Sequence, residues 1–465
     1  MATSQSYLYV TSKHVTSVLL IVVCSLLLSV ASFSQDTTTA QPSTNFLTQK
    51  YLLGDWGGAR TRLEEEKGVK FDFFYISDML YANNGRFQDG GAGWNRVRGS
   101  MWIDFSKLVG PSMKGWKFFV TGLWQGGPNL GADYLGSISN PSGLVSARTE
   151  ILDSYWLSYT MANEKVELKA GQFASMDYYA LCQQCVHFLM EPLDYGFNLR
   201  FNDYASFDPA SGPGAMLTVR PYNWMSYSVA YTSGNRNPYV QDPNGFHFVK
   251  RDSGVISDNV IIQVNQPGQG KVAKEKYYPG QYEVGSTYNG GKFSNPYCVG
   301  TVQAPGCPPL DSPYYSNPLY FSPNTGNYVF YVQGTQAVWR PQAGSNKGLD
   351  VMFGFAHSPN TPYNFVDRNI LAGVVLNGMI SIRPNDSISW GMSYSHVSDK
   401  YASYYAWANP TAPQYSSEKA FEVNYLFQAT PYWLIQPTVQ WYTDVGGLSK
   451  YGTATAVGLR TKVTF

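Results

Sequence analysis

The sequence has little charge: Asp, Glu, Lys and Arg make up only 14% of its 465 residues, against roughly a quarter in ordinary soluble domains. The charges nearly balance, with 33 Lys and Arg against 32 Asp and Glu. A chain without a net field has no general reason to attract nucleic acid or strongly charged substrates. After residue 34 there is also no run of 18 apolar residues, which excludes transmembrane helices from that part.

The first 34 residues have the pattern of a secretory signal peptide. Lys13 and His14 precede the apolar run VTSVLLIVVCSLLLSVA, and small residues follow it. A charged region, an apolar region and small residues near an exit point are typical of signal peptides, and we expect cleavage after Ala31 or Ser34. The alternative is an N-terminal membrane anchor, for which the apolar run is short.

Cysteine is scarce beyond this segment, where only four remain: Cys182, Cys185, Cys298 and Cys307. In an exported chain, four cysteines are by default disulfide-bonded. We expect local pairing within each couple, although three connectivities are possible. A zinc site is the alternative, but it lacks a second CxxC. The sequence predicts no metal and no other cofactor.

Aromatic residues are abundant instead, at 16% of the chain, including 36 Tyr and 12 Trp. They occur in stretches that alternate between apolar and polar residues. In the last ten residues, Leu459, Val463 and Phe465 lie on one face of a strand, and Arg460 and Lys462 lie on the other. Such a strand has an apolar environment on one side and water on the other.

Paired tryptophans indicate that the apolar environment is a lipid bilayer. Trp116 and Trp124 are eight residues apart on one apolar face, and Trp433 and Trp441 repeat the spacing. Eight residues span about 26 Å of strand. With the tilt of a membrane barrel this approaches the height of the apolar band between its two aromatic girdles. Core tryptophans of a soluble β-protein are the alternative.

The connections between the expected strands alternate between short and long. We expect strands that start near residues 69, 98, 115, 149, 164, 214, 224, 257, 278, 327, 348, 368, 387, 418, 431 and 453. Residues 195–201 also alternate and are assigned to the third long loop, 174–213. An even strand number with short periplasmic turns and long outer loops predicts an all-β, 16-stranded antiparallel transmembrane β-barrel, which satisfies its backbone in lipid without free edges. Pro437 interrupts one strand and predicts a bulge.

A short helix is expected before the first strand, in GDWGGARTRLEEEKGV. Asp55 serves as its cap, Gly68 ends it, and Arg60 pairs with Glu64 one turn later. The chain is thereby divided into a signal peptide (1–34), an N-terminal periplasmic segment (35–68) and a barrel domain (69–465).

Several stretches resemble the carbohydrate-selective outer-membrane porins of the OprB type. They are LLGDWGGARTRL with GVKFDFFY, then WLSYTMANEKVELKAGQFASMD, and LFQATPYWLIQPTVQWYTDVGG. The resemblance extends from Leu53 to Phe465, but the Cys182–Cys185 segment and residues 289–326 match no pattern of that family. It implies an outer-membrane barrel of a Gram-negative bacterium that passes monosaccharides and related small neutral solutes by passive diffusion.

The same resemblance suggests the partners. The permeants are small sugars, and the surroundings are outer-membrane lipid and lipopolysaccharide. Terminal Phe465 resembles the aromatic end that the barrel assembly machinery recognises. The oligomeric state is a monomer or a trimer, and the sequence does not decide between them. Two other functions remain as alternatives: a general or anion- and organic-acid-conducting porin, and a secreted glycan-binding β-protein.

A sugar pore needs hydrogen-bonding side chains and aromatic platforms along its lumen. The expected pathway and constriction residues are Arg96, Arg98, Trp102, Asp104, Glu191, Asp194 and Arg200. Alternation also directs toward the lumen Lys70, Asp72, Lys117, Lys165, Glu167, Lys169, Glu422, Arg460 and Lys462. The competing interpretation is that most of these form a mutually neutralising solvated wall without a selective role.

Catalysis is considered because Ser393, Ser395 and His396 lie close together in the sequence. A serine nucleophile needs a base within hydrogen-bond reach. By alternation His396 lies on the apolar face and both serines face the lumen, so they cannot meet. We therefore predict that the protein is not an enzyme.

Overall fold

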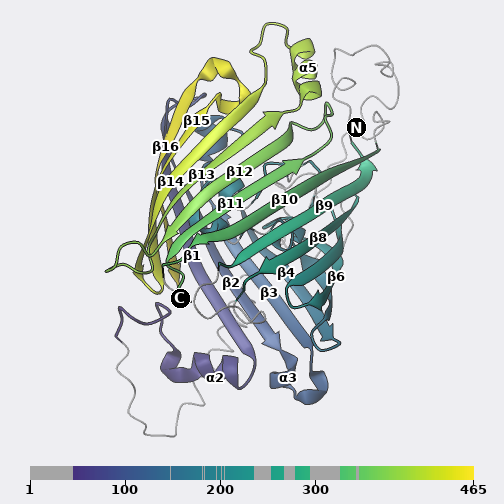
Figure 1. The fold of residues 1–465 in the computed structure, drawn as a ribbon, viewed down its shortest axis with the longest axis vertical. Helices are drawn as coiled ribbons and strands as arrows, with labels where there is room; N and C mark the ends of the chain where they lie inside the picture. The colour runs from purple at the N-terminus through teal and green to yellow at the C-terminus, as the bar shows by residue number, and fades with distance from the viewer. Residues whose placement is uncertain are drawn as a thin grey trace, which may run out of the picture.

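The computed structural model describes residues 45–465 except 147, 181, 183, 195, 200–201, 204, 235–252, 267–277, 294–324 and 342–344. The expected signal peptide and the residues Cys298, Cys307 and Arg200 lie outside the described part. Sixteen antiparallel strands form a closed barrel in which each strand pairs with its neighbours in the sequence and β1 pairs with β16 (Figure 1). The predicted fold class is confirmed.

The strands have the following bounds: β1 Val69–Asn83, β2 Gly90–Asp104, β3 Trp116–Gly126, β4 Thr149–Met161, β5 Val166–Phe173, β6 Gly212–Tyr222, β7 Met225–Ser233, β8 Gly254–Val264, β9 Gly280–Lys292, β10 Thr325–Trp339, β11 Gly348–His357, β12 Val366–Asn377, β13 Ser387–Val397, β14 Ser417–Thr430, β15 Trp433–Thr443 and β16 Thr453–Thr464. All sixteen expected strands are therefore present. Of the alternating stretch 195–201, the described residues 196–199 lie in a loop, as expected.

Two local expectations are wrong. The connection between β1 and β2 is short, because β2 starts at Gly90 rather than near Arg98 and pairs along the whole of β1, up to Ala82↔Gly90. The glycines of this stretch conceal its alternation in the sequence. Pro437 and Gln436 are not paired with β14, but this pairing resumes in the same register on the other side of them, so there is no bulge. Toward β16, Pro437 lies opposite Leu459 in a regular ladder.

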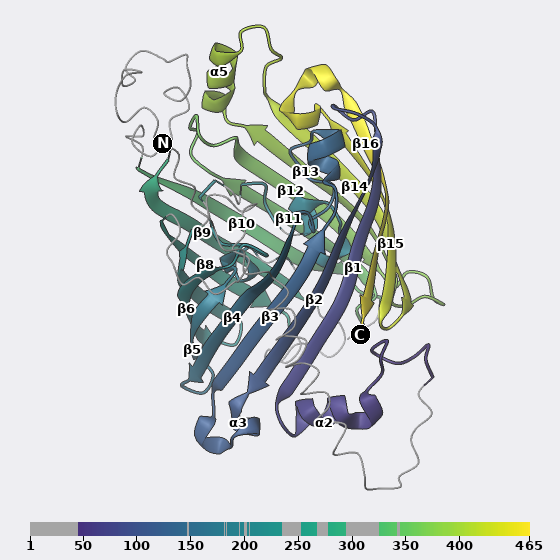
Figure 2. The same cartoon turned by 180° about the vertical axis from the view of Figure 1, so that it is seen from behind.

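The helices lie at the two ends of the barrel or inside it. Figures 1 and 2 show α2 (Ala59–Glu65) and α3 (Phe105–Leu108) at one end and α5 (Asp399–Ala408) at the other. A further short helix, α4 (Glu191–Asp194), belongs to the loop after β5. Within the described ranges, no helix combines the length and the apolar character needed to cross a bilayer.

Large apolar side chains point outward from the barrel. Phe73 is 44% exposed, Trp124 44% and Val457 44%, whereas Ala456, the next residue on the opposite face of β16, is completely buried. Both residues of each tryptophan pair lie on this outer face. An apolar exterior around a polar interior inverts the pattern of a soluble protein and suits a barrel surrounded by lipid.

The N-terminal segment is docked where the barrel closes. Buried Arg60 of α2 donates to the carbonyls of Phe465 at 2.6 Å and of Phe71 at 2.8 Å, thereby joining α2 to both β1 and β16. The predicted Arg60–Glu64 pair is wrong, because Glu64 approaches Lys70 instead, at 3.8 Å. The N-cap of α2 is Gly58 rather than Asp55, although the Asp55 carboxylate still accepts from the backbone amide of helix residue Thr61 at 2.9 Å.

Two loops fold into the interior of the barrel. We call residues 127–148, between β3 and β4, loop L2, and residues 174–211, between β5 and β6, loop L3. Phe188 and Leu193 of L3 are fully buried and lie where the wall has glycine: a Cβ on Gly391 would be 2.7 Å from each of them. Likewise, Phe197 lies against Gly354. Small wall residues thus make room for the inserted loop.

Candidate functional site

Loop L3 is held by buried carboxylates of the barrel wall. Glu283 of β9 accepts from the backbone amide of Ala180 in L3 at 2.8 Å, and also from Asn259 and the Tyr331 hydroxyl at 2.7 Å each. Glu283 is only 1% exposed. A buried charge is tolerable only when it is fully hydrogen-bonded, so this side chain ties L3 to a specific place.

A second carboxylate repeats this arrangement five strands further around the wall. Glu422 of β14, which is fully buried, accepts from the backbone amides of Leu189 at 2.9 Å and Met190 at 2.7 Å. Next to it, Gln436 of β15 donates to the carbonyl of His187 at 2.7 Å. These bonds fix the middle of L3.

Loop L2 is anchored in the same way by Glu418 of β14. Its carboxylate accepts from the amides of Ile138 and Ser139 at 2.8 Å each. L2 and L3 are also joined directly, because the Gly143 amide donates to the Leu189 carbonyl at 2.7 Å. The two loops form one insert, which we call the L2–L3 insert.

An ion-pair group joins L3 to β2 and β4. Asp208 of L3 binds Arg96 at 2.9 Å and Arg98 at 2.5 Å, and Arg98 also lies 3.7 Å from Asp153. Burial opposes ionisation of Asp208, but the two guanidinium groups outweigh it and lower the pKa of this carboxyl below its usual value. Of the two arginines, Arg98 is the more accessible, with 18% of its side chain exposed.

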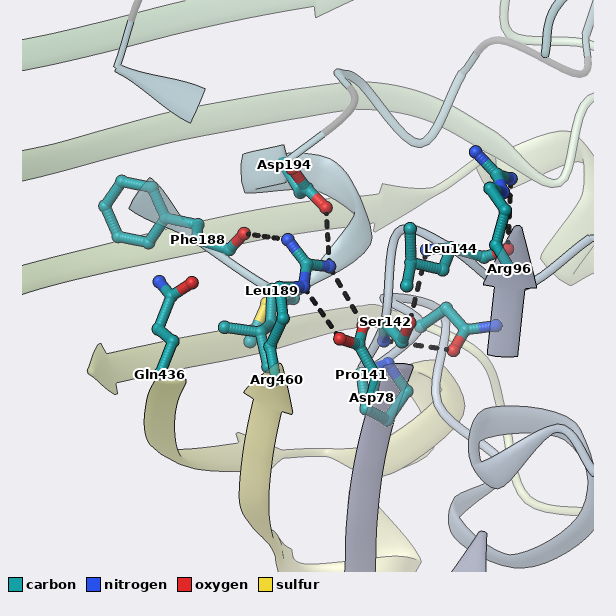
Figure 3. Close-up of polar contacts among 12 residues, drawn as sticks. Asp78, Arg96, Pro141, Ser142, Leu144, Phe188, Leu189, Asp194, Gln436 and Arg460 are labelled. Carbon is teal, nitrogen blue, oxygen red and sulfur yellow. Dashed lines mark hydrogen bonds and ion pairs between the residues drawn. The ribbon is translucent and has the colours of Figure 1, made fainter. Parts of the chain in front are cut away.

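A second ion-pair group joins L3 to β1 and β16. Figure 3 shows the Arg460 guanidinium between three partners: Asp78 at 2.7 Å, Asp194 of α4 at 2.8 Å and the Phe188 carbonyl at 3.0 Å. Ser142 of L2 donates to Asp78 at 2.6 Å. This arginine therefore holds the wall and both loops together.

The two groups belong to one electrostatic region. Lys462 of β16 interacts electrostatically with Asp72, Arg460, Asp194 and Arg98. With Lys462, the region holds four cations, the others being Arg96, Arg98 and Arg460, and five carboxylates, namely Asp72, Asp78, Asp153, Asp194 and Asp208. Its formal charges nearly cancel, with one carboxylate in excess, so the region offers many donors and acceptors with little net field.

Aromatic rings line the wall between this region and the end that carries α2 and α3. Trp102 of β2 and Phe119 of β3 have ring centroids 4.9 Å apart, and Trp156 of β4 stacks on Phe119 at 5.2 Å. The Lys169 ammonium lies 4.3 Å from the Trp156 ring and 3.7 Å from the Tyr178 ring of L3. We call Trp102, Phe119 and Trp156 the aromatic strip.

Comparison with known proteins decides the family. The model for the OprB family of carbohydrate-selective porins matches residues 93–465. The chain belongs to this family. It is 24% identical over 448 residues to Porin B of Pseudomonas aeruginosa, covering 90% of this chain and 91% of Porin B.

Solved structures agree in fold. The high-pH structure of Pseudomonas putida OprB superposes with a TM-score of 0.75 at 18% identity, covering 90% of this chain and all of that one. The low-pH structure superposes with a TM-score of 0.55 at 13% identity, covering 90% and 99%. The protein is therefore a sugar-selective porin with a multi-pass barrel in the outer membrane of Gram-negative bacteria, a channel rather than an enzyme. This also excludes a secreted soluble β-protein.

The porin brings most of its expected pathway residues to one region. Arg96, Arg98 and Asp194 take part in the ion-pair groups, and Trp102 is part of the aromatic strip. Glu191 is buried in α4, where its amide donates to the L2 carbonyl of Asn140 at 2.9 Å.

Two residues of this set lie at turns. Asp104 is the N-cap of α3 and accepts from the Ser106 amide at 2.9 Å, so it stabilises the turn after β2. Lys165 is exposed in a turn whose preceding residues, Ala162 to Glu164, have positive φ values. The strand β5 begins only at Val166.

The other residues expected in the lumen share the inward-facing side of their strands, opposite the exposed apolar residues. They are Lys70, Asp72, Lys117, Glu167, Lys169, Glu422, Arg460 and Lys462. Their environments differ, however. Lys117 is exposed at the end of β3, whereas Glu422 is fully buried under L3.

Sequence reasoning missed several partners. Asp208 and Asp153 complete the first ion-pair group, and Phe119 and Trp156 extend the aromatic strip. Alternation could have identified Phe119. It is two residues after the inward-facing Lys117 and therefore lies on the same face of β3, whereas Phe118 between them faces outward. No local pattern identifies Asp208, because its role depends on how L3 folds.

Two remaining sequence features are placed by the structure. Cys182 and Cys185 form a disulfide within L3. Ser393 and Ser395 are fully buried and hydrogen-bond to Asn369, whereas His396, from the outer face of β13, binds Asp367 at 2.8 Å. The serines and the histidine thus lie on opposite faces, as alternation indicated.

Proposed function

We propose that this porin passes monosaccharides and related small neutral solutes by passive diffusion, and that the region around Arg98, Arg460, Asp194 and Asp208 is its constriction. The observation that carries the proposal is the balanced group of ion pairs where the L2–L3 insert meets the wall. A neutral, hydroxyl-rich solute can exchange hydrogen bonds with such a group, whereas an ion gains little from a region whose charges nearly cancel.

The aromatic strip supports the same conclusion. The C–H faces of a pyranose ring are apolar and pack on aromatic rings, while its hydroxyls reach outward to polar groups. Trp102, Phe119 and Trp156 offer such faces, and Lys169 lies beside them. A row of rings below a polar constriction suits a sugar better than a compact inorganic ion.

Liposome swelling with refolded protein tests this function. Glucose, a disaccharide and a neutral amino acid of similar mass to glucose are compared. We expect faster swelling with glucose than with either of the others. Equal rates for glucose and the amino acid would favour the general diffusion porin, and faster swelling with organic anions would favour the anion-conducting alternative. Absence of swelling with confirmed insertion would contradict an open channel.

The chain's processing and surroundings are part of the proposal. Residues 1–34 act as a cleaved signal peptide, residues 35–68 form a periplasmic segment, and residues 69–465 form the barrel. Phe465, whose carbonyl is bound by Arg60, is the aromatic end presented to the barrel assembly machinery. Outer-membrane lipid and lipopolysaccharide surround a monomer or a trimer, which crosslinking in native membranes would distinguish.

A further inference from the structure

A cavity of about 290 Å³ lies where the N-terminal segment meets the lumen. Its size is close to the lower end of the range for small-molecule sites, roughly 300–1,000 Å³. The cavity lies at the barrel end that carries α2, which in a porin with short periplasmic turns faces the periplasm. A solute that leaves the aromatic strip toward the periplasm reaches this cavity next.

The barrel contributes most of the cavity's lining. Trp102, the last ring of the aromatic strip, lies on it together with Asp72 and Lys70. The Lys70 ammonium is 5.7 Å from the Trp102 ring centre. An aromatic face beside a carboxylate and an ammonium is a combination that binds a polyol, because the ring packs against C–H groups while the charged groups hydrogen-bond hydroxyls.

The N-terminal segment contributes the rest of the lining, through Lys50 and Tyr51. Tyr51 is held by Arg60, whose guanidinium stacks on the ring at 3.2 Å. Since Arg60 is in turn bound to the carbonyls of Phe465 and Phe71, the position of Tyr51 is tied to the closed barrel. The segment outside the barrel is thus placed to take part in permeation.

We propose that this cavity is a saccharide exit subsite, in which a monosaccharide packs on Trp102, hydrogen-bonds to Asp72 and Lys70, and is covered by Tyr51 and Lys50. The proposal rests on the proposed function. It adds that the N-terminal segment is a specificity element of the pore. A sugar that has passed the constriction would bind in this cavity before it is released into the periplasm.

Planar bilayers containing the full chain test the subsite, with D-glucose added to the periplasmic side. The measured quantity is the glucose concentration that gives half of the maximal reduction in ion current. Asp72→Ala should raise it by about tenfold, since a hydrogen bond to a charged group is lost. Tyr51→Leu should raise it by about threefold, since an aromatic contact is lost.

Matched variants keep the test interpretable. Lys67→Ala removes an exposed lysine outside the cavity and should leave the half-saturating concentration unchanged, whereas Lys50→Ala should raise it. Asp72→Asn keeps the shape of the side chain if Asp72→Ala fails to assemble, and should still weaken glucose binding. Heat-modifiable gel mobility verifies that each variant forms a barrel.

The outcomes separate this proposal from the porin function. If the wild type swells with glucose and all variants share its half-saturating concentration, the subsite is wrong and the porin function stands. If the wild type neither swells with glucose nor shows a glucose-dependent current, both fail. A rise in the cavity variants alone, with Lys67→Ala unchanged, supports the subsite.

Discussion

The L2–L3 insert meets the barrel wall through two different kinds of contact. On β9 and β14, Glu283 and Glu422 bind backbone amides of L3 and are at most 1% exposed. On β2 and β16, Arg98 and Arg460 bind carboxylates of L3, and 18% of the Arg98 side chain remains exposed. The first kind fixes the loop out of reach of solutes. In the second kind Arg460 is only 6% exposed, but Arg98 and Asp194 keep 18% of their side chains exposed, which a solute can approach.

This difference teaches which wall residues to associate with selectivity. A carboxylate that accepts from buried amides is fully used in holding the loop, because removing it leaves those amides unsatisfied. An ion pair at the edge of the lumen can exchange partners with a passing hydroxyl at lower cost. A charged side chain that faces inward is therefore not by itself a pathway residue.

The largest effect is expected from Glu422→Ala. Loss of the carboxylate leaves the amides of Leu189 and Met190 without partners, which weakens loop anchoring by roughly 2–6 kcal/mol, at 1–3 kcal/mol for each group. L3 should move, and single-channel conductance and disaccharide swelling should both rise severalfold. Glu422→Gln keeps one acceptor oxygen and should have a smaller effect. Unchanged exclusion of the disaccharide in Glu422→Ala would contradict the anchoring role.

Arg98→Ala should have the next largest effect, by disturbing the accessible ion-pair group. Asp208 keeps Arg96, but Asp153 loses its cation, so the region gains negative charge. We expect cation selectivity in reversal-potential measurements and a drop in glucose swelling of about threefold to tenfold. Arg62→Ala, which removes an exposed arginine of α2 outside the barrel strands, is the matched control and should behave as the wild type.

Phe119→Ala tests the aromatic strip. Removing this ring breaks the contacts with Trp102 and Trp156 and should weaken glucose binding by about twofold to tenfold, as for other aromatic contacts. The neighbouring residue Phe118 faces outward, so Phe118→Ala should leave glucose-dependent current reduction unchanged. Equal effects of the two substitutions would indicate a general loss of stability instead.

The smallest effect on permeation is expected from pH, through Asp203 of L3. Burial raises the pKa of this carboxyl from 3.8 to about 7. The folded loop therefore favours the protonated acid. The stabilisation that Asp203 gives the folded loop is fully present below about pH 4 and is progressively lost as the pH rises toward 7. Glucose flux should change less than twofold.

Hydrogen exchange reports the Asp203 effect directly. After correction for intrinsic rates, opening at the Ala205 amide, which donates to Asp203 at 3.2 Å, should increase roughly tenfold or more between pH 5 and pH 7. In Asp203→Asn this pH dependence should be absent. A wild-type profile that is flat over this range would contradict a raised pKa.

Much of the barrel was predictable because alternation is a local signal. Each strand repeats its pattern every second residue, so Arg460 and Lys462 could be assigned to the lumen and Leu459 to lipid without knowledge of any neighbour. The signal failed where glycine replaced the alternating residues, at the start of β2, and at a turn, where Lys165 was counted as part of a strand.

The sequence by itself thus determined the barrel, its strand number, and the side chains that face water or lipid. Only the tertiary structure decided what the inward residues do, because L3 reaches wall residues far along the chain: Arg460 binds Asp194, and Arg98 binds Asp208. Such pairs follow from the path of a loop folded inside a closed barrel. No periodicity in the sequence encodes that path, so whether a charge anchors the loop or lines the pathway became visible only with the loop in place.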